Sequence, residues 1–199
     1  MIHLAVFASG TGSNARALIR YFRHHPQIAV RAVFCNRPQA GVVQVAAEEG
    51  VPLVLFSRYE LYDSDHVLNE LRRLHMDYIA LAGFLWKIPE RILQAYPGRI
   101  VNLHPALLPK YGGKGMYGMK VHQEVLQAGE RESGITIHLV NERYDAGPIL
   151  FQQSIPVQDG ESAEQLAQRI HELEHFWYPR IIEQWILDPA RWPKAGAQP

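Results

Sequence analysis

The chain has 199 residues, of which 47% are hydrophobic and 20% are charged. This balance suits a globular core and excludes wholesale disorder. Because 20 basic residues balance 20 acidic ones and the formal net charge is +0, no global positive field favours nucleic acid. The length predicts one domain over residues 1–187, followed by a C-terminal tail at 188–199.

The cysteine content and the apolar runs predict a protein of the cytoplasm. The single cysteine, Cys35, lies in an apolar run and can form no internal disulfide. Residues 1–7 lack the basic region of a signal peptide. The longest apolar run, Tyr78 to Trp86, is far shorter than the ~20 residues of a membrane span. We expect no membrane or nucleic-acid partner, and a homodimer is compatible with the sequence.

Along residues 1–104, short apolar runs alternate with longer amphipathic ones, which is the pattern of parallel strands joined by helices. The sequence predicts strands at Ile2–Phe7, Ile28–Phe34, Leu53–Phe56, Tyr78–Leu85 and Ile100–Leu103. It predicts helices at Ala15–Phe22, at Val42–Glu49 before Gly50, at Asp63–Leu74, and from Pro89 to near Tyr96. We therefore expect an α/β fold with a Rossmann-like, mostly parallel sheet and helices on both faces.

After residue 104 the pattern changes. Prolines and four glycines predict a loop over residues 105–119. A helix is predicted at Val121–Gln127, strands at Ile135–Val140 and Ile149–Ile155, and a long last helix from about Ala163 to Leu187. Pro179 is expected to kink or split that helix, and the tail at Pro189–Pro199 is expected to fray.

A glycine-rich turn, Ser9-Gly10-Thr11-Gly12-Ser13-Asn14, separates the first strand from the first helix. Glycines let the backbone approach a ligand, and the helix N-terminus behind them offers N–H groups that bind phosphate. One alternative is a plain turn with Ser13 or Asn14 as the helix cap. Another is the dinucleotide site of an NADP-dependent reductase. NAD is disfavoured because the second strand ends at Cys35-Asn36-Arg37, without an acidic residue.

Asn102 and His104 form the most informative polar pair. Since side chains alternate along a strand, both point to the same side, and Pro105 places them at the strand's carboxyl end, where open α/β sheets bind ligands. An amide and an imidazole there suit oxyanion stabilisation and proton transfer. The alternative is a hydrogen-bonded histidine at a capped strand end. His138 is a further candidate, with a buried core histidine as the alternative.

Two other segments carry candidate chemistry. Asp145 stands in a turn, where aspartate is commonly structural, but beside His104 it would raise the pKa of that imidazole. The stretch His171-Glu172-Leu173-Glu174-His175 matches the His-Glu-x-x-His pattern of zinc proteases. We disfavour zinc hydrolysis because downstream only Glu183 and Asp188 remain as third ligands, and Glu183, eight residues on along the same helix, is poorly placed. Zinc hydrolysis would also leave the glycine-rich turn and the Asn102/His104 pair unexplained.

Five stretches together resemble the phosphoribosylglycinamide formyltransferases, the folate-dependent transformylases of purine biosynthesis. They are Ser9–Asn14, Leu81–Phe84, Asn102–Pro109, Gly134–His138 and Asp145–Pro148. The most specific is the Asn-x-His-Pro-x-Leu-Leu-Pro string, which other formyl-folate transferases and hydrolases share. The resemblance covers roughly residues 1–187. Such transferases and hydrolases carry additional domains that we do not expect in 199 residues.

The resemblance implies an enzyme that transfers a formyl group from 10-formyltetrahydrofolate, its co-substrate, to the amine of glycinamide ribonucleotide. The products are formylglycinamide ribonucleotide and tetrahydrofolate, and no metal is implied. Asn102 and a protonated His104 would polarise the formyl oxygen. Asp145 would raise the pKa of His104 and steer a water molecule that moves the proton. A regulator that binds nucleotide or folate without catalysis stays open as an alternative.

The resemblance also implies substrate contacts. For the ribonucleotide, the implied residues are Gly12, Ser13, Asn14, Gly113 and Glu174. For the folate, they are Arg58, Leu85, Trp86, Lys87, Ile88, Asn102 and His138. Two features depart from the family: Trp86 stands where a basic residue is frequent, and the loop at 112–119 is a few residues longer than usual.

Overall fold

A computed structural model describes residues 1–193. The chain divides into two compact units, one of residues Met1–Val101 and one that begins at Asn102. The single domain predicted over residues 1–187 therefore stays a prediction. Within residues 1–193, no helix combines the length and the apolar character needed to cross a membrane.

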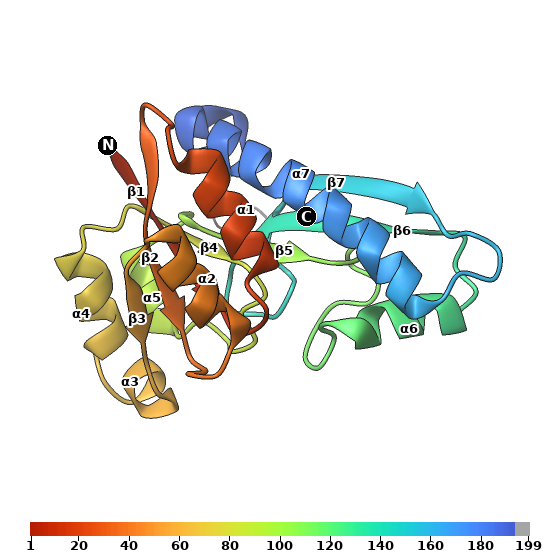
Figure 1. Ribbon diagram of the computed structural model, residues 1–199, viewed down its shortest axis with the longest axis horizontal. Coiled ribbons are helices and arrows are strands. Elements are labelled where there is room, and N and C mark those ends of the chain that lie inside the picture. Colours follow the sequence, from red (N-terminus) through yellow and green to blue (C-terminus); the bar gives the residue numbers. More distant parts are fainter. Residues whose placement is uncertain (194–199) are drawn as a thin grey trace. The chain divides into compact units, whose positions relative to one another are not determined.

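The first unit contains a parallel sheet. Its strands are β1 (Ile2–Ala8), β2 (Ile28–Cys35), β3 (Leu53–Leu55) and β4 (Tyr78–Leu81), in the order β3-β2-β1-β4 (Figure 1). Residues 4–8 of β1 are fully buried, and the ring of Phe7 stacks on Phe34 at 4.8 Å. A strand that is buried on both faces needs such an unbroken apolar run. The predicted α/β class is confirmed.

Helices connect these strands. They are α1 (Ser13–Phe22), α2 (Gly41–Glu49), α3 (Arg58–Tyr62), α4 (His66–Arg73) and α5 (Glu90–Ala95). The helices α1 and α2 pack against each other, as do α3 and α4. Gly50 closes α2 in the left-handed conformation, as predicted. The next strand, β5 (Ile100–His104), begins where the Ile79 N–H donates to the Arg99 carbonyl at 2.9 Å.

Two predictions in the first unit are wrong in detail, and one helix was missed. The strand predicted to reach Leu85 ends at Leu81, because Gly83 turns the backbone with φ of +71°. The helix predicted from Asp63 begins at His66. The helix α3 was not predicted, although its capping box is legible in the sequence: Ser57 accepts from the Glu60 N–H, and the Glu60 carboxylate accepts from the Ser57 N–H.

The second unit combines an antiparallel hairpin with two helices. The hairpin strands are β6 (Glu132–Leu139) and β7 (Ile149–Pro156), and the helices are α6 (Met119–Gln127) and α7 (Ala163–Leu187). Helix α7 packs against α6, β6 and β7. Within that contact, the rings of Trp177 and Phe151 lie 4.6 Å apart.

Helix α7 runs unbroken through Pro179, so the expected split does not occur. Proline removes one helical N–H, but the neighbouring residues Tyr178, Ile181 and Ile182 are buried, and this packing holds the helix together. A short 3₁₀ helix (η1) follows at Pro189–Arg191. The tail was expected to fray over Pro189–Pro199, and its residues 194–199 lie outside the described residues.

Candidate active site

Three elements of the second unit carry the polar residues that the sequence singles out. Asn102 and His104 lie on β5, His138 lies on β6, and Asp145 stands in the connection between β6 and β7. Asp145 has a φ of +50°, a conformation that costs a non-glycine residue energy. Gly147 fixes the turn, because a Cβ there would lie 1.7 Å from the Leu139 carbonyl oxygen.

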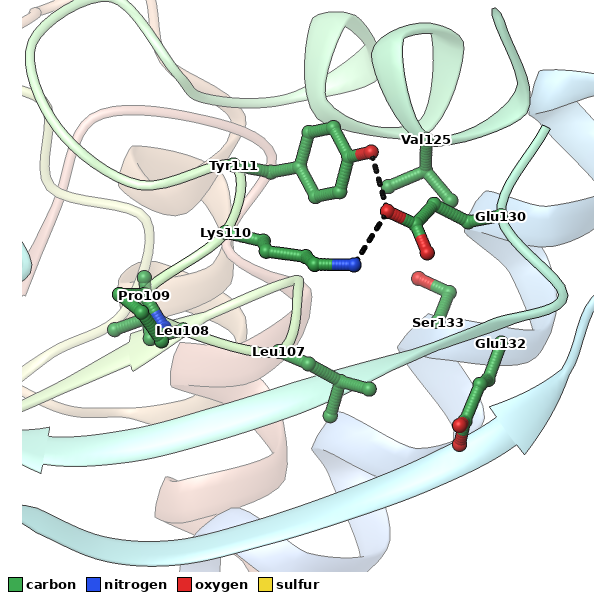
Figure 2. A pocket seen from close by; sticks show the side chains of 9 residues that line it. All are labelled: Leu107, Leu108, Pro109, Lys110, Tyr111, Val125, Glu130, Glu132 and Ser133. Atoms are coloured by element: carbon green, nitrogen blue, oxygen red, sulfur yellow. Dashed lines mark hydrogen bonds and ion pairs between the residues drawn. The ribbon is translucent and has the colours of Figure 1, made fainter. Parts of the chain in front are cut away.

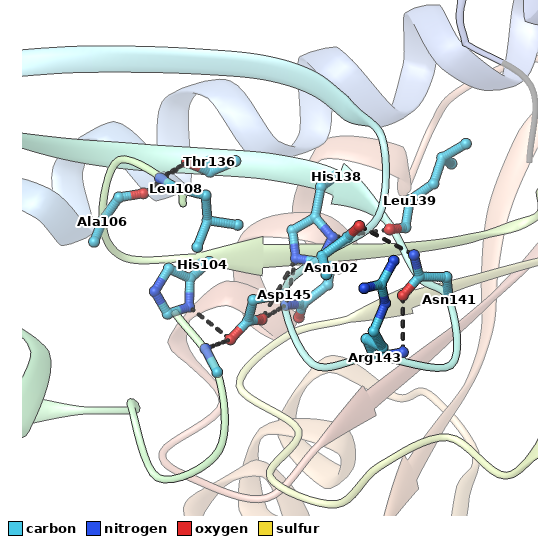
Figure 3. A network of polar contacts seen from close by, with 12 residues as sticks. Asn102, His104, Ala106, Leu108, Thr136, His138, Leu139, Asn141, Arg143 and Asp145 are labelled. Carbon is cyan, nitrogen blue, oxygen red and sulfur yellow. Dashed lines mark hydrogen bonds and ion pairs between the residues drawn. The ribbon is translucent and has the colours of Figure 1, made fainter. Parts of the chain in front are cut away.

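The Asp145 carboxylate joins all three of these side chains (Figure 3). Its Oδ1 lies 3.3 Å from Asn102 Nδ2, which donates to it, and 3.5 Å from His138 Nε2. Its Oδ2 lies 3.7 Å from His104 Nδ1. Asn102 Nδ2 also lies 3.1 Å from His138 Nε2. Asn102, His104, His138 and Asp145 therefore form one polar cluster, called the carboxylate cluster below.

The loop after β5 completes this cluster with backbone groups. His104 Nε2 lies 2.7 Å from the Tyr111 carbonyl oxygen, and the Gly113 N–H donates to Asp145 Oδ2 at 2.9 Å. A Cβ at Gly112 would lie 2.5 Å from Leu108 Cδ2 and 3.3 Å from Asp145 Cβ, so the Leu108 side chain would have to move. The loop thus packs closely enough to hold both His104 and Asp145.

Burial and charge oppose each other at His104. Burial lowers its pKa most, while the Asp145 carboxylate and the Tyr111 carbonyl raise it and His138 lowers it further, with a net downward shift. Asp145 does act in the predicted direction, but burial outweighs it. The predicted protonated imidazole is therefore not the form that the surrounding groups favour.

Asp145 keeps its charge despite partial burial. Burial raises its pKa, but the hydrogen bond with His138, the nearby His104 and the Gly113 N–H together lower the pKa below its ordinary value. The carboxylate cluster therefore presents an ionised carboxylate, an amide and two imidazoles, of which His104 has a lowered pKa, and such groups suit a reaction that develops an oxyanion and moves a proton.

Two supporting residues were not found by sequence reasoning. Thr136 Oγ1 donates to the Ala106 carbonyl at 2.6 Å and accepts from the Leu108 N–H at 3.0 Å, which ties the loop after β5 to β6. Thr136 lies two residues before His138, so the alternation of side chains along a strand was a usable signal. The Tyr111 carbonyl left no signal, since every residue carries one.

In the first unit, the glycine-rich turn leads directly into α1. Gly12 is the N-cap, with φ of +84°, so Ser13 and Asn14 are the first two residues of the helix. The alternative with Ser13 or Asn14 as the cap is therefore wrong. A Cβ at Gly12 would lie 2.7 Å from Val42 Cα, so this turn packs tightly on α2. Ser9 Oγ donates to Asn36 Oδ1 at 2.7 Å and accepts from the Leu85 N–H at 3.1 Å.

Of the residues predicted to contact the folate, Asn102 and His138 belong to the carboxylate cluster, and the other five lie near a cluster of aromatic rings in the first unit. Trp86 lies 6.3 Å from both Phe56 and Tyr62, measured between ring centroids. The Tyr62 hydroxyl donates to the Lys87 carbonyl at 2.8 Å, and the Arg58 guanidinium stacks over the Tyr62 ring at 4.8 Å. Ile88 is buried, and the Leu85 N–H donates to Oγ of Ser9, the residue that follows β1.

The His-Glu-x-x-His stretch lies on α7. Its two histidines, His171 and His175, are exposed, and their rings stack 6.3 Å apart. Glu174 is buried, with its carboxylate 3.9 Å from His171 Nε2. Among residues 1–193, no group of three or more His, Cys, Asp or Glu side chains is placed to hold a metal ion. Of the residues expected to contact the ribonucleotide, Gly113 joins the carboxylate cluster, while Glu174 lies on α7.

The chain is similar to known formyl transferases along most of its length. The model of the formyl transferase family matches residues 2–182. The chain is 39% identical to the chloroplastic phosphoribosylglycinamide formyltransferase of Arabidopsis thaliana, over 97% of this chain and 68% of that protein. It is 38% identical to the Bacillus subtilis phosphoribosylglycinamide formyltransferase, over 94% of this chain and 95% of that protein.

A solved structure shows the same likeness in three dimensions. The phosphoribosylglycinamide formyltransferase of Anaplasma phagocytophilum aligns with a TM-score of 0.85 and 32% identity, over 94% of this chain and 87% of that one. The carboxylate cluster and the glycine-rich turn lie within the residues that the family model matches. The sequence, the fold and the site agree, and the chain belongs to the formyl transferase family.

Proposed function

We propose that this chain is a phosphoribosylglycinamide formyltransferase, which moves the formyl group of 10-formyltetrahydrofolate to the amine of glycinamide ribonucleotide in purine biosynthesis. The observation that carries the proposal is the carboxylate cluster, in which Asp145 joins an amide and two imidazoles. The relatives that share the family carry this activity in their names. We place the reaction in the cytoplasm, on small-molecule substrates.

The proposed chemistry needs no covalent enzyme intermediate. The glycinamide nitrogen attacks the formyl carbon, so that a new N–C bond forms and the formyl oxygen becomes an oxyanion. Asn102 and His104 donate hydrogen bonds to that oxygen and stabilise its developing charge, and the oxygen becomes a carbonyl again when the intermediate collapses. The bond between the formyl carbon and the folate nitrogen then breaks, and the proton lost by the amine ends on that nitrogen.

Asp145 is proposed to control the protonation state of His104. Its carboxylate lies 3.7 Å from His104 Nδ1 and raises the pKa of an imidazole that burial otherwise lowers. An oxyanion in the site adds a second negative charge near the ring, which favours the imidazolium form during the reaction. The balance between the two effects keeps the imidazole ready to take up and release a proton.

The remaining predicted contacts belong to binding. We propose that Gly12, Ser13 and Asn14 hold the ribonucleotide phosphate through the N–H groups that open α1. We propose that residues 85–88 and Arg58 contact the folate, with Trp86 supplying an aromatic surface. Glu174 and His138 are assigned to the ribonucleotide and the folate, respectively. Each of these assignments rests on the family resemblance and on the positions described above.

The test is an absorbance assay of tetrahydrofolate release in which each substrate is omitted in turn. We expect release only when both substrates are present. Folate release without the ribonucleotide would show a hydrolase. Binding of both substrates without release would show a regulator, and fluorescence transfer from a tryptophan to a bound nicotinamide would support a reductase.

Replacement of His104 by alanine tests the mechanism. We expect kcat to fall by about 10²- to 10⁴-fold, the range for loss of a general acid or base, with little change in the melting temperature. Initial rates and circular dichroism measure the two quantities. A His104→Ala enzyme with the wild-type kcat would contradict the assigned role.

A further inference from the structure

The second unit contains a cavity that the proposed reaction does not use. It has a volume of about 260 Å³ and lies between the loop after β5, the C-terminal half of α6 and the start of β6 (Figure 2). Its apolar wall is formed by Leu107, Leu108, Pro109 and Val125. Its polar lining comes from Lys110, Tyr111, Glu130, Glu132 and Ser133.

The first sign of a ligand is Ser133. It is only 2% exposed, and its hydroxyl has no hydrogen-bond partner within residues 1–193. Figure 2 shows the hydroxyl pointing into the cavity, toward Glu130 and Lys110. A buried hydroxyl without a partner is costly, and most buried polar groups are paired. Ser133 therefore offers an unfilled hydrogen bond at the wall of the cavity.

The second sign is the charge of the lining. Lys110 Nζ and the Tyr111 hydroxyl both bond to Glu130 Oε1, at 2.8 and 2.9 Å. The other carboxylate oxygen lies on the side of Ser133 in Figure 2. Glu132, an exposed residue whose carboxylate points away from Lys110 in Figure 2, adds a second carboxylate at the rim, so the lining carries two carboxylates and one ammonium group. The cavity therefore favours a cation with hydrogen-bond donors.

We propose that this cavity binds a small primary amine with an apolar body. The ammonium group would donate to the Glu130 carboxylate and to Ser133 Oγ, while the apolar body packs against the leucine, proline and valine wall. Charge-assisted hydrogen bonds of this kind are about twice as strong as neutral ones. The volume suits a single ring or a short aliphatic chain, and it is smaller than a typical pocket for a drug-sized ligand.

The cavity shares a residue with the carboxylate cluster. The side chain of Tyr111 lines the cavity and bonds to Glu130, while its backbone carbonyl lies 2.7 Å from His104 Nε2. Two residues later, the Gly113 N–H donates to Asp145. A ligand that competes for Glu130 would therefore change the position of Tyr111, and with it the environment of the His104 imidazole.

The experiment is a titration of the full-length ¹⁵N-labelled protein with benzylamine, followed by NMR. Benzyl alcohol, which has the same ring and no charge, is the matched probe. We expect saturable shifts of the Tyr111, Glu130 and Ser133 amides with benzylamine, and a dissociation constant about tenfold higher for the alcohol. Equal affinity for the two probes, or the lack of saturable shifts at these amides, overturns the proposal.

Variants locate the binding groups. Glu130→Gln should remove the preference for the amine, whereas Glu172→Gln, at an exposed carboxylate on α7, should preserve it. Because Glu130 also holds Lys110 and Tyr111, Ser133→Ala provides an independent test: it removes an unpaired hydroxyl and should weaken benzylamine binding without lowering the melting temperature. Unchanged benzylamine binding in Ser133→Ala contradicts the assigned contact.

A last readout tests the link to His104. Saturation with benzylamine should shift the His104 Nε2 resonance in the wild-type protein and leave it unchanged in Glu130→Gln. If the amides respond and this resonance does not, the cavity binds the amine but the link through Tyr111 is refuted. Neither result depends on turnover, so the outcome is separate from that of the proposed reaction.

Discussion

The carboxylate cluster and the glycine-rich turn use the chain in opposite ways. In the cluster, side chains from β5, β6 and the following turn meet on one carboxylate. In the turn, the interacting groups are backbone groups, because the N-cap of α1 is a glycine and has no side chain that could bond to the helix. The cluster therefore depends on titratable groups and burial, while the turn depends on backbone conformation and close packing.

This difference predicts different kinds of damage. Substitutions in the cluster should change kcat and its pH dependence, since they alter charge at a reacting group. Substitutions in the turn should change the KM for the anionic substrate and the stability of the protein. They should leave the pH dependence of kcat unchanged. Variants at Asp145 and Gly12 test this separation, and a variant at His122 tests the effect of burying an imidazole outside both regions.

The largest effect is expected for Asp145→Asn, which keeps the shape of the side chain and removes its charge. We expect kcat to fall by about 10²- to 10⁴-fold. The pKa of His104 should fall further, because the Asp145 carboxylate that raises it is lost. Rates across pH and an NMR titration of the imidazole measure both changes. A normal kcat with an unchanged His104 pKa would show that Asp145 has only a structural role in its turn.

A second test concerns His122, which is buried on α6. Its pKa is lowered from 6.5 to about 4, chiefly by burial and then by the nearby His171 and His104. At a pH between about 4 and 6.5, His122 binds a proton in the unfolded chain and not in the folded protein. The free energy of unfolding therefore falls as the pH falls through this range. The full shift corresponds to about 3 kcal/mol.

His122→Gln removes this titration. We expect its stability to decline less than that of the wild type as the pH is lowered from 6.5 to 4, as measured by urea unfolding at several pH values. Parallel pH profiles for the two proteins would show that the buried histidine does not contribute to acid sensitivity.

The smallest effect is expected in the turn. Gly12→Ala forces a side chain onto a residue with φ of +84° and places its Cβ 2.7 Å from Val42 Cα. We expect a loss of about 1–3 kcal/mol in stability and a higher KM for the ribonucleotide at unchanged pH dependence. Gly10→Ala is the matched control, because no atom lies within 4 Å of its Cβ. Equal behaviour of the two variants would contradict the packing argument.

Much of the fold was predictable because local patterns agreed with tertiary structure. The apolar runs of β1 and β2 and the left-handed Gly50 were sufficient to place those elements. The end of β4 was predicted wrongly because apolar residues continue from Leu81 to Leu85, while the backbone turns at Gly83. A five-residue helix such as α3 is too short to show a helical period and is marked by its capping box, so the apolar periodicity did not predict it.

The meeting of the four side chains of the carboxylate cluster was predictable in part, and its electrostatics were not. Alternation placed Asn102 and His104 on one side of a strand, and Asp145 was a candidate from its turn whose role the family resemblance specified. The net pKa shift of His104 depends on burial against a charge 3.7 Å away, and no sequence pattern gives that balance. The Tyr111 carbonyl and the orphaned Ser133 hydroxyl likewise arise from three-dimensional packing.

The connection between β6 and β7 also limits how the enzyme can be redesigned. Gly147 has no room for any side chain beside the Leu139 carbonyl, and Asp145 must keep its left-handed backbone. Glu142, Arg143 and Tyr144 are exposed in the same connection. A library aimed at new acceptor amines should therefore vary these three positions and leave the residues after them unchanged.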